Sequence, residues 1–300
     1  MEIKREYPKS KAIVFFIIAF VGAYACQIAG AYFNQTNNTG LYTIMMALAM
    51  FVPTIAVLIS HKGLGNAKTG INWKINFKRN WKWLLAAWLL PTVFTALGTV
   101  LYYVVFPAHF DPNMGYITSI GMDMQGMTTD MIAIVSIVSA VVYAPFINMF
   151  AALGEEVGWR GYMTPMLTDK LGRKPALIIG GIIWGAWHWP LIIGVGYNYG
   201  TGYLGEPFTG MLAMCATCVI LGIALSYLYD KSKCIWLPAI AHGAINAIGT
   251  VPILFSDGSI ESGLLGPAPS GLVTIAPLGI VALIIFFAHK NKENSTVENQ

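Results

Sequence analysis

The chain has 300 residues, of which 56% are hydrophobic and only 11% are charged, with a net charge of +4 and a mean hydropathy of +0.62. A soluble domain of this length would not cover its surface with so few charges. The charged residues also occupy short stretches between apolar runs, and no nucleic-acid-binding motif is present. The composition therefore excludes a soluble enzyme or a nucleic-acid-binding protein, and it predicts an integral membrane protein.

Apolar runs recur along the chain at the length that a helix needs to cross about 30 Å of hydrocarbon. In chain order they are 12–33, 41–60, 83–106, 131–153, 176–194, 209–229, 235–254 and 272–289. We therefore predict an all-α, polytopic membrane protein with about eight transmembrane helices. Because no segment is long enough for a separate soluble unit, residues 1–300 are expected to form a single integral membrane domain.

Basic residues follow one side of this predicted bundle. All 18 Lys and Arg residues lie in the N-terminal segment, in the stretches 61–82, 154–175 and 230–234, or in the C-terminal tail, and the alternate loops carry acidic residues only. Lys and Arg collect in cytoplasmic loops through the positive-inside bias. We therefore expect both termini in the cytoplasm, and the short loops are typical of a prokaryotic plasma-membrane protein.

Ionisable side chains at membrane depth are costly unless they are paired or hydrated, so each is a candidate functional residue. The first group follows the fourth predicted span and includes Glu155, Glu156 and Arg160. In a helix, Glu156 and Arg160 lie four residues apart on one face, whereas Glu155 points about 100° away. We expect Arg160 to keep Glu156 ionised and to leave Glu155 able to exchange a proton. The alternative is a helix end that meets the aqueous boundary.

Two further polar groups interrupt the fifth and seventh predicted spans. His188 lies about 18 Å along the fifth span at 1.5 Å per residue, and His242 and Asn246 have the i, i+4 spacing that places them on one face of the seventh. A lone His is often a hydrogen-bonded core residue, and a His–Asn pair also serves polar contacts between helices. Neither group alone indicates catalysis.

Together, these groups supply the parts that hydrolysis of an amide requires. Glu155 is expected to act as general base, with His188 sharing the attacked water, and His242 and Asn246 are expected to donate hydrogen bonds to the oxyanion. No covalent intermediate and no cofactor is needed. We expect these residues to meet in a polar active-site cavity open to the cytoplasm.

At these positions the chain resembles the CPBP family, the CAAX-processing and bacteriocin-processing intramembrane proteases often called Abi. The family motifs are Glu-Glu-x-x-x-Arg, an aromatic residue before a His, and His-x-x-x-Asn, and they match residues 155–160, 184–188 and 242–246 in order. Trp184 stands where Phe is common, a change of bulk that we expect to leave the chemistry untouched. The resemblance covers about residues 130–255, the expected catalytic core, and the first three spans contribute only topology to it.

The resemblance implies that Glu155 and His188 activate the water, that His242 and Asn246 form the oxyanion hole, and that Glu156 and Arg160 are a supporting ion pair. It also implies a CAAX prenyl protease-like glutamic endopeptidase that cleaves a C-terminal tripeptide or a peptide bond near the membrane. The expected partners are a peptide or protein substrate, with or without a lipid, and membrane lipids.

Two other functions are compatible with the same residues. Glu155, His188 and His242 could form a three-ligand zinc site of an intramembrane metalloprotease, although the His-Glu-x-x-His signature is absent. A non-catalytic immunity or transport protein could use the polar groups to bind a ligand. A transporter would more often show repeat symmetry, which the sequence lacks.

Overall fold

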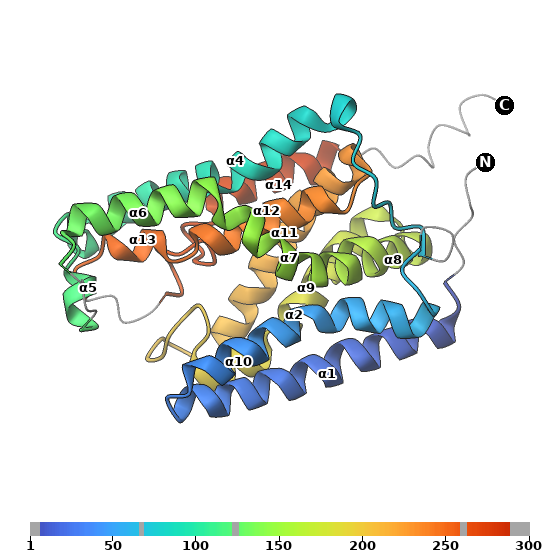
Figure 1. Ribbon diagram of the computed structural model, residues 1–300, viewed down its shortest axis with the longest axis horizontal. Helices are drawn as coiled ribbons and strands as arrows, with labels where there is room; N and C mark the ends of the chain where they lie inside the picture. The colour runs from blue at the N-terminus through green and yellow to red at the C-terminus, as the bar shows by residue number, and fades with distance from the viewer. Residues whose placement is uncertain (1–6, 66–68, 122–125, 259–262, 289–300) are drawn as a thin grey trace.

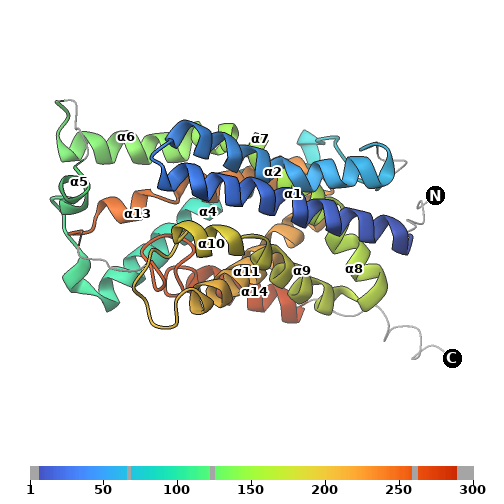
Figure 2. The same cartoon turned by 90° about the horizontal axis from the view of Figure 1, so that it is seen from below.

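The computed structural model describes residues 7–65, 69–121, 126–258 and 263–288. Within these ranges the regular secondary structure is helical, and β-bridge positions are isolated, as between Phe110 and Ser256. Most of the long helices run along the long axis of the molecule (Figures 1 and 2). In chain order the elements are α1 (Lys9–Gln35), α2 (Thr39–His61), α4 (Phe77–Val105), η1 (Pro107–His109), α5 (Gly115–Ser119), α6 (Thr129–Val142), α7 (Ala144–Glu156), η2 (Val157–Met163), α8 (Thr164–Leu171), α9 (Arg173–Trp187), α10 (Trp189–Val195), α11 (Phe208–Ser232), α12 (Trp236–Ile248), α13 (Val251–Leu254) and α14 (Ala276–Ala288).

The bundle has two ends that differ in their connections. Helix α1 begins and α14 finishes at the same end, which we call the terminal end, at the right of Figure 1. The connections after α2, α8 and α11 also lie there, and they are the Lys-rich and Arg-rich stretches of the sequence. The connections after α1, α4, α10 and α13 lie at the opposite end, which we call the distal end. Which end faces the cytoplasm remains a prediction.

The helices have the length and apolarity of a polytopic membrane protein. Six helices or continuous helix pairs meet both requirements, namely α1, α2, α4, α9 with α10, α11, and α12 with α13. Helix α6 and the run α7 to α8 together form a seventh candidate, bent by 53°, and α14 is apolar but has only 13 residues. Apolar side chains such as Ile284 and Phe287 point outward, as lipid requires. The all-α, polytopic prediction is confirmed, and each predicted span coincides with a helix or a helix pair.

The fourth predicted span, 131–153, has different limits in the structure. Helix α6 ends at Val142, and α7 begins with Pro145 in its first turn, where proline lacks the N–H that would continue the α6 ladder. The chain then stays helical through the π-helical turn η2 to the end of α8. Glu155 therefore lies inside a helical run of residues 144–171, and not at the end of a span as we expected.

Two glycines bring this helical run into close contact with α2. A Cβ added at Gly154 would lie 2.5 Å from the carbonyl oxygen of Met50, and one at Gly158 would lie 2.4 Å from the Cβ of a proline in α2. The hydroxyl of Thr54 also donates to the carbonyl of Gly154 at 2.7 Å. Small residues four apart allow membrane helices to approach closely. Helix α2 therefore fixes the position of the segment that carries the two glutamates.

Candidate active site

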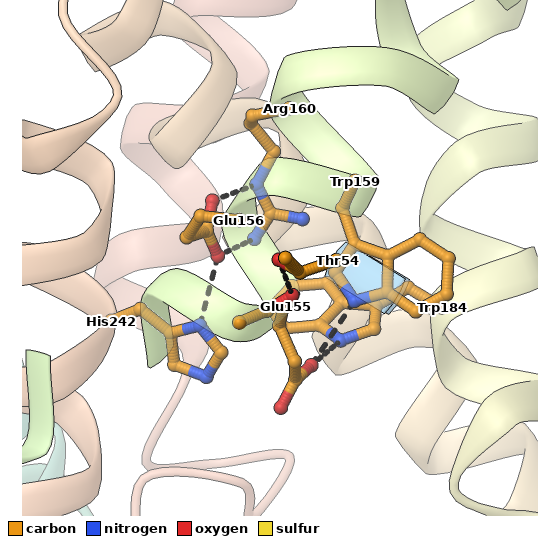
Figure 3. A network of polar contacts seen from close by, with 8 residues as sticks. Thr54, Glu155, Glu156, Trp159, Arg160, Trp184 and His242 are labelled. Atoms are coloured by element: carbon orange, nitrogen blue, oxygen red, sulfur yellow. Dashed lines mark hydrogen bonds and ion pairs between the residues drawn. The ribbon is translucent and has the colours of Figure 1, made fainter. Parts of the chain in front are cut away.

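A network of buried polar side chains joins three of the predicted site residues (Figure 3). Nη2 of Arg160 donates to Oε1 of Glu156 at 2.7 Å, and Nε of Arg160 lies 2.5 Å from Oε2. From α12, Nδ1 of His242 lies 2.8 Å from the same Oε1. Glu156, Arg160 and His242 are 0%, 2% and 6% exposed. The sequence predicted the ion pair from its spacing, but it gave no sign that Glu156 also holds His242.

The partner of His242 fixes the orientation of its ring. An ionised carboxylate only accepts hydrogen bonds, so Nδ1 of His242 carries the proton and donates it to Glu156. The other ring nitrogen, Nε2, then lies on the side away from Glu156. A carboxylate that holds a His in this way determines which nitrogen faces the substrate.

Glu155, the neighbour of Glu156, has a different set of partners. Its Oε2 accepts hydrogen bonds from Nε1 of Trp159 at 3.1 Å and from Nε1 of Trp184 at 2.7 Å (Figure 3). These are the only hydrogen bonds of its carboxylate to side chains in the part of the chain that the structure describes, and the side chain is buried. One glutamate is thus held by a cation, and the other is held by neutral N–H donors.

Trp184 contacts most of the candidate site. Besides its bond to Glu155, its ring lies 4.2 Å from the guanidinium carbon of Arg160, in cation–π geometry. The rings of His188 and His242 lie 6.2 and 5.4 Å from it, centroid to centroid. The expectation that Trp in place of Phe is only a change of bulk is therefore wrong, because Phe has no N–H to donate to Glu155.

His188 lies at the junction between α9 and α10. Its Nδ1 is 2.9 Å from the carbonyl oxygen of Trp184, and because a carbonyl only accepts, Nδ1 carries the proton and Nε2 is left as an acceptor. Helix α1 holds this junction: Gln27 donates to the carbonyl of Trp187 at 2.9 Å, and the indole of Trp187 donates to a carbonyl of α1 at 3.1 Å. The first span therefore contributes to the site directly, which the family motifs did not indicate.

A cavity of about 320 Å³ brings the remaining site residues together. Trp184 and His188 line it from α9 and its end, and His242 and Asn246 line it from α12. The rest of the wall comes from α11, from α13 and from the connections after α10, α12 and α13. Glu155 is not one of the lining residues, but its carboxylate is bonded to Trp184 in the cavity wall. The residues predicted as water-activating and oxyanion-binding groups are therefore close neighbours in space.

The zinc alternative is not matched by this arrangement. Among the described residues, no group of three or more His, Cys, Asp or Glu side chains is placed to hold a metal ion. Oε2 of Glu155 already accepts two indole N–H groups, and His242 directs Nδ1 to Glu156. Each of the three proposed ligands is thus held by a protein partner, as the second shell of a metal site would also hold it, so activity measured in a chelator is the test of this alternative.

Two comparisons with known proteins concern the segment that carries these residues. Residues 136–248, which include all the predicted site residues, match the family model of the Rce1-like type II CAAX prenyl endopeptidases. The chain is also similar to CAAX prenyl protease 2 of Methanococcus maripaludis, with 26% identity over 259 residues that cover 84% of this chain and 89% of the relative. These findings set aside the immunity and transport alternatives. The chain is a membrane peptidase, and its segment 136–248 is similar to the intramembrane endopeptidases of the CPBP family.

Proposed function

We propose that the protein hydrolyses a peptide bond near the C-terminus, or in a membrane-proximal part, of its substrate, and that Glu155 and His188 activate the water. The observation that carries this proposal is the difference between the two adjacent glutamates. Glu156 is bound by Arg160 and His242, whereas Glu155 is held by neutral indoles only. A carboxylate that no cation engages is better placed to act as a general base toward water.

The proposed reaction uses the cavity residues and Glu155, whose carboxylate is bonded to Trp184 in the cavity wall. Glu155 takes a proton from a water molecule that also donates a hydrogen bond to Nε2 of His188. The water oxygen then forms a bond to the substrate carbonyl carbon, and the electron pair of the C=O bond moves onto the oxygen. When this tetrahedral intermediate collapses, the C–N bond breaks and the amine leaves with the proton from Glu155. Every proton in this cycle is carried by the chain's own residues or by water.

His242 and Asn246 are suited to stabilise the oxyanion. Both line the cavity, one helical turn apart on α12, and preorganised donors of this kind lower the barrier by several kcal/mol. Because Nδ1 of His242 already donates to Glu156, its Nε2 donates only when the ring is an imidazolium. The supporting ion pair thus acts on catalysis through His242.

The substrate class is proposed from the relative. The Methanococcus maripaludis protein is named a CAAX prenyl protease, so we infer for this chain a polypeptide attached to the membrane, with or without a lipid, that is cut close to its C-terminus. The apolar outer faces of the helices keep the peptidase among membrane lipids. A substrate attached to the same membrane reaches the site by lateral diffusion.

Comparative proteomics tests both the activity and the substrate. Membranes from cells that produce the wild type or Glu155→Gln are compared for new C-termini, which should appear with the wild type only. Glu206→Gln, at an exposed position in the distal connection after α10, serves as the matched control and should behave as the wild type.

A peptide identified in this way then allows kinetics in nanodiscs. Glu155→Gln should abolish most turnover, and the addition of His188→Ala should cost little more, because residues that act as a unit are not additive. Asn246→Ala should lower kcat by roughly 10² to 10³ and leave KM nearly unchanged, since an oxyanion donor acts in the transition state. Wild-type turnover in Glu155→Gln would end the glutamate-base mechanism.

A further inference from the structure

The last predicted span, 272–289, is helical only from Ala276 onward. Helix α14 has 13 residues, which at 1.5 Å per residue cover about 20 Å of the roughly 30 Å of hydrocarbon. The stretch before it, residues 264–275, has no regular secondary structure. We call this stretch the irregular segment.

The irregular segment lies among the helices of the bundle. Thr217 donates to the carbonyl oxygen of Ser270 at 3.1 Å, and Thr217 is about 14 Å along α11 from the start of that helix. Against α4, a Cβ added at Gly98 would lie 1.8 Å from the carbonyl oxygen of Thr274. Ala268, Ser270 and Thr274 are buried. Within a membrane, non-helical backbone is tolerated only where protein covers it or where it lines a water-filled cavity.

Protein groups satisfy part of the polar backbone of the irregular segment. The N–H of Leu272 donates to the carbonyl of Leu264 at 3.0 Å, and the N–H of Gly271 donates to the carbonyl of Ala268 at 2.9 Å. Together with the bond from Thr217, these contacts fix the path of the segment. The backbone groups that remain are therefore held in place.

Two of these remaining groups belong to the wall of the catalytic cavity. Ala268, Pro269 and Ser270 line this cavity together with His242 and Asn246. Among the described residues, none accepts a hydrogen bond from the N–H of Ala268 or of Ser270, and Pro269 between them has no N–H. Buried backbone N–H groups are almost always paired with protein, water or a ligand. Donors two residues apart match an extended peptide, in which every second residue faces the same edge.

We propose that the Ala268–Ser270 edge binds the backbone of the substrate peptide and holds it extended against His242 and Asn246. The small side chains of the edge leave its backbone accessible, and main-chain hydrogen bonds give affinity for an extended chain of any sequence. The cavity of about 320 Å³ is small for a ligand pocket, so the edge engages the residues next to the scissile bond. That the ligand is a peptide rests on the proposed function. The irregular segment itself lies outside the family motifs and outside the matched residues 136–248.

Peptides that each lack one carbonyl test the edge in the active enzyme. In the peptide identified by proteomics, one amide at a time is replaced by an alkene isostere, which keeps the extended shape but has no acceptor. Two positions, two residues apart, should raise KM about 3- to 10-fold and leave kcat nearly unchanged, because a hydrogen bond made in both the ground state and the transition state contributes to binding only. An equal effect at every position, or an effect at none, would overturn the proposal.

Ser270→Pro removes one donor and should make one of the two positions insensitive to the isostere. Leu265→Pro is the matched control, because Leu265 is an exposed residue of the same segment outside the cavity wall. It should retain both sensitive positions. Two sensitive positions in Ser270→Pro would contradict the assignment of that donor, and if this variant does not accumulate, the scan with the wild type still decides.

Amide hydrogen exchange tests the edge without turnover. Glu155→Gln is incubated with the same peptide or, if proteomics finds no cleavage, with a panel of C-terminal peptides from membrane proteins of the host cell. Bound peptide should slow exchange at Ala268 and Ser270 and leave Leu272, whose N–H is already bonded, unchanged. Cleavage by the wild type without this protection would overturn the edge and leave the proposed function standing. Protection without cleavage would end the proposed function and leave the edge standing, and a panel that protects neither amide would overturn the edge.

Discussion

Removal of either member of the Glu156–Arg160 ion pair should destabilise the protein, but by different amounts. Glu156→Gln leaves the guanidinium of Arg160 buried without a carboxylate, and an unpaired buried charge costs about 3 to 5 kcal/mol. Arg160→Met leaves Glu156 with His242, whose Nδ1 is 2.8 Å away and whose ring can carry the balancing charge. We therefore expect Glu156→Gln to cause the larger loss of stability.

The double variant Glu156→Gln/Arg160→Met removes both charges together. Replacement of a buried ion pair by uncharged residues of similar volume is often close to neutral, and Met retains an apolar stem against Trp184. Stability should therefore return close to that of the wild type. Turnover should not return, because His242 loses the carboxylate that orients its ring. The same pair of changes is thus expected to rescue folding and to leave catalysis impaired.

Thermal unfolding in detergent, together with turnover of a cleaved peptide, measures the two effects. Since 1 kcal/mol shifts Tm by about 2 to 4 °C in domains of 150 to 250 residues, Glu156→Gln should lower Tm by roughly 6 to 20 °C. Lys170→Met, at an exposed position on α8, is the control and should change Tm little. Equal losses in the two single variants, or additive losses in the double variant, would refute the shared-carboxylate model.

Three other features of the structure give shorter predictions. Trp159→Phe and Trp184→Phe should each leave one indole donor on the Glu155 carboxylate, whereas the double variant leaves none, and an unsatisfied buried group costs about 1 to 3 kcal/mol. The kcat of the double variant should therefore fall by more than the two single-variant factors multiplied together. A fall equal to that product would contradict the sharing of one carboxylate oxygen by the two indoles. Gly158→Ala should lower Tm more than Gly65→Ala, because an added Cβ meets an α2 proline at 2.4 Å in the first case and nothing within 4 Å in the second. Turnover should persist in a chelator, and a loss that zinc restores would support the metalloprotease alternative.

Features set by one helix were predictable from the sequence, and features set by packing were not. The apolar lengths predicted the helices, and the four-residue spacing of Glu156 and Arg160 predicted their ion pair. The bond from His242 to Glu156 joins residues 86 apart in sequence. It depends on how α12 packs against α7, for which no local pattern exists.

The limits of the fourth span show why hydropathy alone was insufficient. A hydropathy profile ends a span where charges begin, so it placed the boundary at residue 153, just before the two glutamates. The helix continues because Arg160 and the indoles satisfy those carboxylates inside the bundle. Pro145 did signal the break before α7, and a rule that gives weight to proline would have found it. For Trp184, the prediction considered only the volume of the side chain, whereas its N–H donates a hydrogen bond to Glu155.

The buried ion pair has two consequences for the water that Glu155 would activate. Arg160 lies between the catalytic cavity, which it meets through Trp184, and a larger cavity at the terminal end. As long as Glu156 holds Arg160 in place, the guanidinium stays packed against the ring of Trp184, whose N–H donates to Glu155. The carboxylate of Glu156 also accepts from Nδ1 of His242. The pair that orients His242 therefore also holds the indole that positions the proposed general base.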